Sequence, residues 1–357
     1  MFRIPDSPRC KWKGFPGGPT KPVFYLQHGL MSSSDCWVLS GPSRALGFQL
    51  ADACYDVWLG NSRGNRYARK NTKLSASDRD FWKFTWHHIG YNDVAAQINY
   101  VLVKTGHRAL HFVGHSQGTT GYLVLMSLRP DFLKKLKTSH LLAPVAFCGS
   151  MRSVMFSYGS QVLLHLPDFE LPGHYKPLAT LISYFCSFPI AALLCKNVLF
   201  LYTGAISRHM DKLLTDAITI THPAGSSSRQ IKHFAQLHSS HKFRNFDFGE
   251  TENMKIYGTA TPPEYPLNRI KPSEPVNIYY SDDDVLAAVS DVLLLSQNLP
   301  HKRVFRVQAD DWTHLDFIFA HNLRTVIGNQ IIALSHAYEK RHSGKKLNPH
   351  DAVLHSF

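Results

Sequence analysis

The feature that most constrains the fold of this 357-residue chain is the pentapeptide Gly-His-Ser-Gln-Gly at residues 114–118. The segment before it, 109–113, is short and rich in apolar and β-forming residues, which is typical of a buried strand. The segment after it, 119–128, carries apolar side chains at helical spacing. A serine flanked in this way predicts a nucleophile elbow, a tight turn that exposes the serine hydroxyl.

Each small residue of the pentapeptide has a physical role in this interpretation. Gly114 and Gly118 have no Cβ, so the strand and the helix can approach each other closely. Ser116 would lie at the positive end of the helix dipole, which favours the oxyanion formed when a serine attacks an ester. The same pentapeptide also occurs by chance as an ordinary glycine turn, so the rest of the chain has to support the interpretation.

Partners for the serine follow in the order acid and then histidine, which an α/β-hydrolase fold requires. The segment 275–280 predicts a strand, and three consecutive acids follow at 282–284. An acidic run is often only a solvated turn. Another strand is expected at 303–307, and His314 is singled out by its position after it. Surface or packing roles are expected for six of the other histidines: His87, His88, His107, His111, His115 and His140.

An early strand, expected at 22–27, is followed by His28-Gly29-Leu30. A glycine at this point lets a backbone N–H turn toward a substrate carbonyl, as in the oxyanion hole of this fold. A plain turn between strand and loop is the alternative.

Four blocks of sequence together resemble the signature motifs of the acid lipase family, which includes gastric and lysosomal acid lipases and many insect lipases. The blocks are Leu-Gln-His-Gly-Leu at 26–30, Trp-Leu-Gly-Asn-Ser-Arg-Gly-Asn at 58–65, the pentapeptide, and His-Leu-Asp-Phe at 314–317. The resemblance runs in register from about Phe2 to about His336.

This resemblance implies a set of catalytic residues. Ser116 would be the nucleophile, Asp284 the acid and His314 the base; Asp284 is chosen because Asp-Val-Leu-Ala from this position matches the family's Asp-Leu-Leu-Ala. The backbone N–H groups of Leu30 and Gln117 would form the oxyanion hole. The implied activity is hydrolysis of neutral-lipid esters, triacylglycerols or sterol esters, at a lipid interface, with no cofactor and no metal.

The spacing of the expected strands indicates an insertion. Between a strand expected at 141–146 and the one at 275–280, the chain is too long for a loop of the core. We therefore expect an α/β-hydrolase core, with a mostly parallel sheet and helices on both faces, at 1–146 and 269–357. A mainly helical cap is expected at 147–268.

Within this cap, the segment 178–195 has no charged residue. Its length just reaches that of a membrane span, but Pro189 and several polar residues disfavour a span. Buried cap helices and an amphipathic segment are the alternatives. The resemblance implies instead that the segment belongs to a lid, at about 178–206, that opens onto a lipid surface.

The six cysteines show no metal-binding spacing, so no zinc site is expected. The resemblance implies a disulfide between Cys186 and Cys195, with two buried free thiols as the alternative. A disulfide implies an oxidising compartment, and the family is secreted or lysosomal. The chain begins without the apolar core of a signal peptide, which indicates an incomplete amino terminus, lacking the first strand or strands, or a member that stays inside the cell.

Composition narrows the remaining function classes. A hydrophobic content of 44% with 18% charged residues is that of a globular protein. The net charge of +13 comes without any nucleic-acid-binding motif, and the short lysine runs at 134–137 and 345–346 are expected to be solvated faces. A basic surface also suits anionic lipid or bile-salt interfaces. An esterase for smaller soluble esters and a non-catalytic lipid-binding relative remain as alternatives, because a fold does not fix a function. The oligomeric state is not predicted.

Overall fold

The computed structural model describes residues 1–11, 21–153, 156, 164–171 and 207–342. Its core is a seven-stranded sheet with the strand order β1-β3-β2-β4-β5-β8-β9. Only β1 is antiparallel to its neighbour. The strands are β1 (Phe2–Ile4), β2 (Val23–Gln27), β3 (Asp56–Leu59), β4 (Leu110–His115), β5 (Leu136–Leu142), β8 (Val276–Tyr280) and β9 (Lys302–Arg306). The predicted mostly parallel sheet is confirmed.

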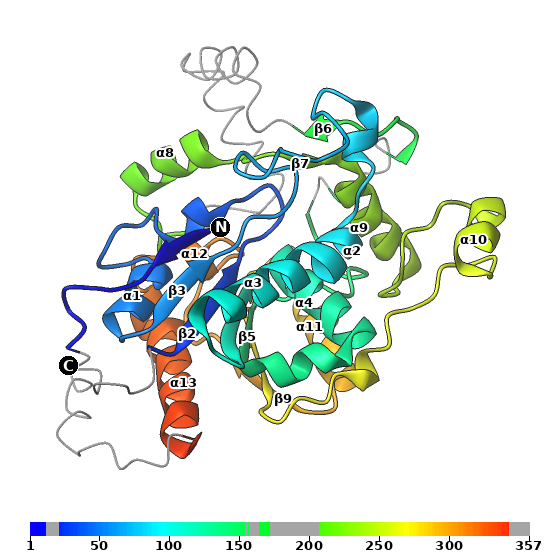
Figure 1. Ribbon diagram of the computed structural model, residues 1–357. Helices are drawn as coiled ribbons and strands as arrows, with labels where there is room; N and C mark the ends of the chain where they lie inside the picture. Colours follow the sequence, from blue (N-terminus) through cyan, green and yellow to red (C-terminus); the bar gives the residue numbers. More distant parts are fainter. Residues whose placement is uncertain (12–20, 154–155, 157–163, 172–206, 343–357) are drawn as a thin grey trace.

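Helices cover both faces of this sheet (Figure 1). Side chains of neighbouring residues on β4 point to opposite faces. His111 reaches Glu339 of α13 (Asn329–His342), with 2.8 Å between Nε2 and Oε1, whereas Phe112 packs on Tyr122 of α4 (Gln117–Leu128), with ring centroids 5.0 Å apart. The helices α13 and α4 therefore lie on opposite faces.

Shorter helices and turns complete the described part of the core. The helices are α1 (Leu46–Asp52), α2 (Trp86–His88), α3 (Ala95–Thr105), α11 (Val289–Asn298) and α12 (Asp316–Phe319). Turns of 3₁₀ helix lie at Ser34–Trp37, Arg79–Trp82, Pro130–Lys135 and Leu267–Arg269, and π-helical turns at Ile89–Val94 and Arg324–Gly328.

The prediction of a strand at 141–146 is wrong, because β5 runs from Leu136 to Leu142. The strand begins earlier because its polar side chains find buried partners. The hydroxyl of Thr138 lies 2.8 Å from Nδ1 of His111, and Nδ1 of His140 lies 3.1 Å from the hydroxyl of Tyr279. With their polar atoms paired, these residues can face the interior at little cost.

Between β5 and β8 the chain leaves the sheet. Its described elements are β6 (Glu170–Leu171), β7 (Ser226–Ser227), α8 (Lys212–Thr221), α9 (Ser228–Ser240) and α10 (Glu250–Tyr257). The strands β6 and β7 pair antiparallel, and α10 projects to one side in Figure 1. The expected lid at 178–206, with Cys186 and Cys195, lies outside the described residues.

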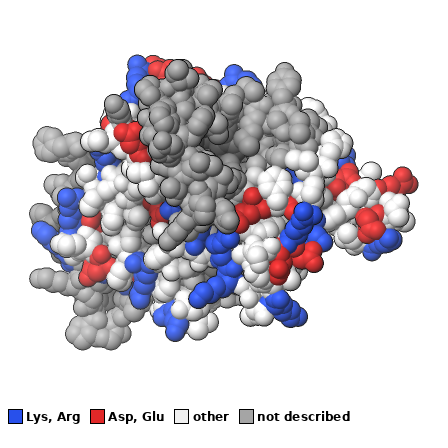
Figure 2. All heavy atoms as spheres, turned by 90° about the horizontal axis from the view of Figure 1, so that it is seen from above, with Lys and Arg blue, Asp and Glu red and all other residues white. Residues whose placement is uncertain are grey.

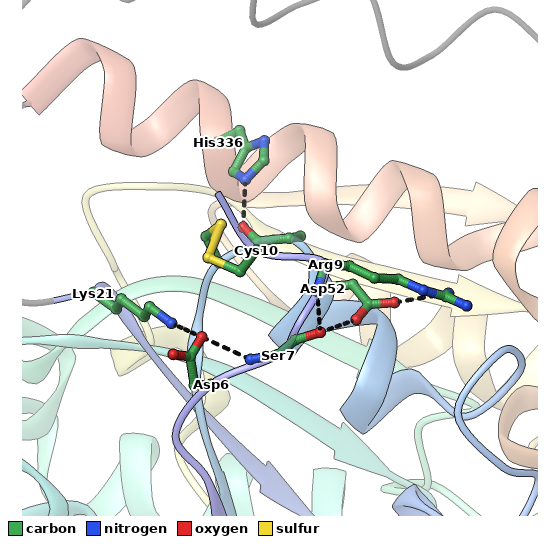
Figure 3. The surroundings of a disulfide bond; sticks show 9 residues. Asp6, Ser7, Arg9, Cys10, Lys21, Asp52 and His336 are labelled. Atoms are coloured by element: carbon green, nitrogen blue, oxygen red, sulfur yellow. Dashed lines mark hydrogen bonds and ion pairs between the residues drawn. A yellow bond between two sulfur atoms is a disulfide. The ribbon is translucent and has the colours of Figure 1, made fainter. Parts of the chain in front are cut away.

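A disulfide that the sequence did not predict joins Cys10 to Cys54 (Figure 3). It links the segment after β1 to the loop after α1. Close by, Nε2 of His336 on α13 lies 3.2 Å from the carbonyl oxygen of Ala53, and Ser7 bonds to Asp52. The disulfide thus fastens the amino-terminal segment beside the edge of the sheet.

Acidic and basic side chains are mixed on the projection around α10 (Figure 2). Lys242 pairs with Glu264, and Lys255 with Glu252, with N–O distances of 2.7 and 2.6 Å. The positive net charge is therefore not gathered on this part of the surface. Over the described ranges, the structure holds no helix with the length and apolarity needed to span a membrane.

Candidate active site

Ser116 occupies the sharp turn between β4 and α4. Its backbone angles, φ 53° and ψ −123°, lie in a region that L residues seldom adopt. The Ser116 N–H donates to the carbonyl oxygen of Leu142 over 3.0 Å, and helix α4 begins at the next residue. The sheet and the helix together hold the serine in a strained conformation, which is common at functional sites.

The two glycines of the turn are required by close packing. A Cβ on Gly118 would lie 2.3 Å from the carbonyl oxygen of Gln27, and one on Gly114 would lie 3.0 Å from the backbone of Gly118. A Cβ on Gly29 would lie 3.0 Å from the Cβ of Ser116. The loop after β2 therefore passes directly against the serine.

Asp284 and His314 form a buried pair after β8 and β9. The Nδ1 atom of His314 lies 2.7 Å from Oδ2 of Asp284, and both side chains are almost fully buried. The other oxygen of Asp284 accepts the N–H groups of Leu286 and Ala287 at 2.8 and 2.9 Å. Burial alone would raise the pKa of Asp284, but the contacts with His314 and the two N–H groups lower the pKa overall.

The two preceding acids have other partners. Asp282 is exposed and pairs with Arg306. Asp283 accepts the N–H of Asp311 over 3.0 Å. Of the three consecutive acids, Asp284 therefore contacts the histidine, and its two neighbours lie toward the surface.

The Nε2 atom of His314 is buried and has no hydrogen-bond partner among the residues that the structure describes. No hydrogen bond joins this nitrogen to the hydroxyl of Ser116. Such contacts are often long before substrate binds and shorten in the reacting complex. The free nitrogen is thus available to accept a proton.

His115 also contacts His314. Its Nε2–H donates to the carbonyl oxygen of His314 over 3.0 Å, and the two ring centroids are 4.8 Å apart. Burial lowers the pKa of His115 to about 3, so its ring is neutral. The sequence offered no signal for this contact, because the two residues are 199 positions apart.

Asp316 holds the loop on which His314 lies. It accepts the N–H and the hydroxyl of Thr313 at 2.6 and 2.9 Å, and the hydroxyl of Ser207 at 2.6 Å. Burial raises the pKa of Asp316. Ser207 directly follows the undescribed segment 172–206, so this carboxylate links the histidine loop to the chain between β5 and β8.

A small cavity opens at Ser116. Apart from the serine, its lining is apolar: Leu30, Val145, Met151, Phe156, Phe234 and Leu286. Residues from the chain between β5 and β8, such as Phe156 and Phe234, thus meet Leu30 and Leu286 around the hydroxyl. Such a lining suits a hydrocarbon chain better than a polar group.

The two expected oxyanion donors come from segments next to this serine. Leu30 lines the cavity, and Gln117 is the first residue of α4, whose N–H has no acceptor within the helix. Within the described parts of the chain, neither N–H donates a hydrogen bond, and no cluster of three His, Cys, Asp or Glu side chains could hold a metal ion.

A mostly parallel sheet, a strained serine after its central strand and an Asp–His pair after later strands define an α/β-hydrolase. The family model of the α/β hydrolase fold matches residues 22–147, and that of a partial α/β-hydrolase lipase region matches 1–41. A soluble variant of monoglyceride lipase from Saccharomyces cerevisiae has a similar fold, with a TM-score of 0.54 and 14% identity over 89% of this chain and 87% of that one.

Curated relatives identify the particular family. The chain is 38% identical to Lipase 3 of Drosophila melanogaster, over 95% of this chain and 86% of the relative. It is 36% identical to gastric triacylglycerol lipase of Rattus norvegicus, over 88% of this chain and 80% of the relative. It is 34% identical to the lysosomal acid lipase/cholesteryl ester hydrolase of the same species, over 95% of this chain and 85% of the relative. The chain belongs to the acid lipase family, and the predicted class, a serine ester hydrolase of the α/β-hydrolase fold, is confirmed.

Proposed function

We propose that the chain hydrolyses the ester bonds of neutral lipids, triacylglycerols or sterol esters, with Ser116 as the nucleophile. Two observations carry this proposal together: the strained serine at an apolar cavity, and the buried pair of His314 and Asp284. The names of the gastric and lysosomal relatives support the same substrate class.

The proposed mechanism starts with the proton of Ser116. The free Nε2 of His314 accepts this proton while the serine oxygen attacks the ester carbonyl carbon. Asp284 accepts the Nδ1–H of His314, which fixes the ring tautomer and stabilises the imidazolium ion. The histidine then gives the proton to the leaving alcohol, and water hydrolyses the acyl-enzyme in the same way.

Two backbone N–H groups, those of Leu30 and Gln117, stabilise the oxyanion of the tetrahedral intermediate in this mechanism. Because Gln117 is the first residue of α4, the positive end of the helix dipole also stabilises the developing negative charge. The loss of one such donor typically lowers the rate by about 10²–10³-fold.

We assign the inserted residues, 147–268, to a cap that contacts lipid, with a lid at about 178–206. Support comes from the apolar residues that this stretch adds to the cavity and from the family to which the chain belongs. The named relatives also favour a secreted or lysosomal enzyme, and the disulfide between Cys10 and Cys54 suits such an oxidising compartment.

A substrate panel tests the proposal. Purified protein is given an emulsified long-chain triacylglycerol, a sterol ester in mixed micelles and a soluble short-chain ester. We expect release of fatty acid from at least one long-chain ester, with a rise in rate above its solubility limit. Turnover of the soluble ester alone would favour an esterase, and binding without turnover of any ester would favour a lipid carrier.

A further inference from the structure

We infer that His28 is a positioning residue, which orients the Leu30 N–H toward the oxyanion through the Gly29–Leu30 peptide. The buried turn 61–65 holds His28 in the tautomer that this task requires. The inference rests on the proposed function, because it assumes that the Leu30 N–H is an oxyanion donor. It adds His28 and the turn 61–65 to the proposed function, as groups that act without contacting the substrate.

The orientation of the Gly29–Leu30 peptide is fixed from its carbonyl side. Nδ1 of His28 lies 2.7 Å from the carbonyl oxygen of Gly29, and the N–H of Ser32 donates to the same oxygen over 3.3 Å. In a trans peptide the N–H points opposite to the C=O. With the Gly29 oxygen held toward His28, the Leu30 N–H must point away from it, and Leu30 lines the cavity at Ser116.

The tautomer of His28 follows from its other nitrogen. The backbone N–H of Ser62 donates to Nε2 over 3.1 Å, so Nε2 must be an acceptor. The side-chain amide nitrogen of Asn65 also lies 3.1 Å from Nε2. In the neutral ring the proton is therefore on Nδ1, where it can be donated to Gly29.

The amide of Asn65 is itself oriented by its surroundings. Its oxygen accepts the N–H of Tyr67 over 3.0 Å, and its nitrogen donates to the side-chain oxygen of Asn61 over 2.7 Å. Asn61 in turn bonds to both the N–H and the hydroxyl of Ser34 at 3.0 Å. The turn 61–65 is thus anchored at Ser34, shortly after the segment 28–30 that carries the expected oxyanion donor.

Three substitutions test this role. His28→Ala removes the donor to Gly29, whereas His28→Asn can place an amide N–H near the position of ring Nδ1. Asn65→Ala leaves the ring present but removes one of the two groups that set its tautomer. The measurements are kcat and KM on a soluble short-chain ester, and the affinity for a trifluoromethyl ketone, whose tetrahedral adduct carries an oxyanion.

We expect His28→Ala to lower kcat by about 100-fold with little change in KM, because the lost interaction acts mainly in the transition state. Affinity for the trifluoromethyl ketone should fall by a similar factor. His28→Asn should recover about tenfold of the lost kcat. Asn65→Ala should lower kcat by about tenfold, and it keeps the test valid if His28→Ala does not fold.

Two matched controls separate positioning from stability. His140→Ala and Asn253→Ala each remove a buried, hydrogen-bonded side chain of the same type that does not line the cavity. Both should lower the melting temperature and leave kcat unchanged while the protein is folded. Normal kcat in folded His28→Ala and Asn65→Ala, or unchanged affinity for the ketone, would overturn the inference.

Failure of this inference is distinguishable from failure of the proposed function. If Ser116→Ala abolishes ester turnover while the His28 and Asn65 variants keep normal kcat, only the positioning role is wrong. If the wild-type protein hydrolyses no ester, or if Ser116→Ala retains activity, the proposed function fails and the inference fails with it.

Discussion

At the scale of single residues, burial distinguishes three acids that are adjacent in sequence. Asp284 is enclosed with His314, while Asp282 and Asp283 bond to Arg306 and to the backbone of Asp311 near the surface. Of the three carboxylates, only the one in contact with Nδ1 can fix the tautomer of His314. The proposed acid role therefore belongs to one position.

Substitution of each acid tests this assignment. Asp284→Asn should lower kcat by about 10⁴-fold, because an amide N–H facing Nδ1 favours the wrong tautomer. Asp282→Asn and Asp283→Asn are matched controls and should stay within about threefold of the wild type. Steady-state kinetics on a soluble ester measures all three. A severe loss in Asp283→Asn with a mild one in Asp284→Asn would contradict the assignment.

The sequence could indicate the turn that holds Ser116 and the position of His314 after a strand, because both are local signals. Asp284 was chosen among three adjacent acids by the family resemblance, and the structure places it against His314. Their catalytic roles stay predictions. The segment that contains His28 carries a signal, but the contact of its ring with Ser62 does not, and neither does the contact of His115 with His314, because both join residues that are far apart in the chain. Their roles depend on the geometry of a folded loop, which residue type and spacing do not encode.

At the scale of secondary-structure elements, the strands β2, β4, β8 and β9 were predictable from short runs rich in β-forming residues. The strand β5 begins earlier than predicted, and its buried polar residues match partners on neighbouring elements. The disulfide between Cys10 and Cys54 was likewise hidden, because the pairing of six cysteines depends on which strands become neighbours. Tertiary contacts, rather than local preference, determine both features.

Two glycines of α4 give a matched pair of substitutions. Gly118→Ala should lower the free energy of unfolding by about 1–3 kcal/mol, because the added Cβ would lie 2.3 Å from the backbone of Gln27. In Gly121→Ala the nearest atom lies at an ordinary 3.5 Å, so helix propensity should make the change neutral or stabilising by up to about 1 kcal/mol. Urea unfolding measures both. Similar effects of the two changes would contradict a tight elbow.

At the scale of the whole molecule, the folded protein keeps many histidines buried and neutral. Burial is the largest cause, and it lowers the pKa of seven of them to about 4 or about 3: His28, His87, His88, His111, His115, His140 and His222. In an unfolded chain the same groups have a pKa near 6.5. Between these values the unfolded state binds more protons than the folded state.

Stability should therefore decrease with acidity. Above pH 6.5 these histidines are neutral in both states, and as the pH falls toward 4 each one favours unfolding, by up to about 3 kcal/mol for a shift of this size. We expect the melting temperature, measured by calorimetry, to fall continuously from pH 7 to pH 4. A melting temperature that stays constant or rises over this range would contradict buried, neutral histidines.

The central claim, that Ser116 is the nucleophile of an ester hydrolase, is tested most directly by covalent labelling. A fluorophosphonate probe should modify the wild-type protein once, and peptide mass mapping should locate the label at Ser116. The rate of ester hydrolysis should fall in proportion to the fraction of protein that is labelled. Ser116→Ala should fold normally, resist the probe and lose roughly 10⁵–10⁶-fold in kcat. Labelling at another serine, or near-normal turnover by folded Ser116→Ala, would contradict the account.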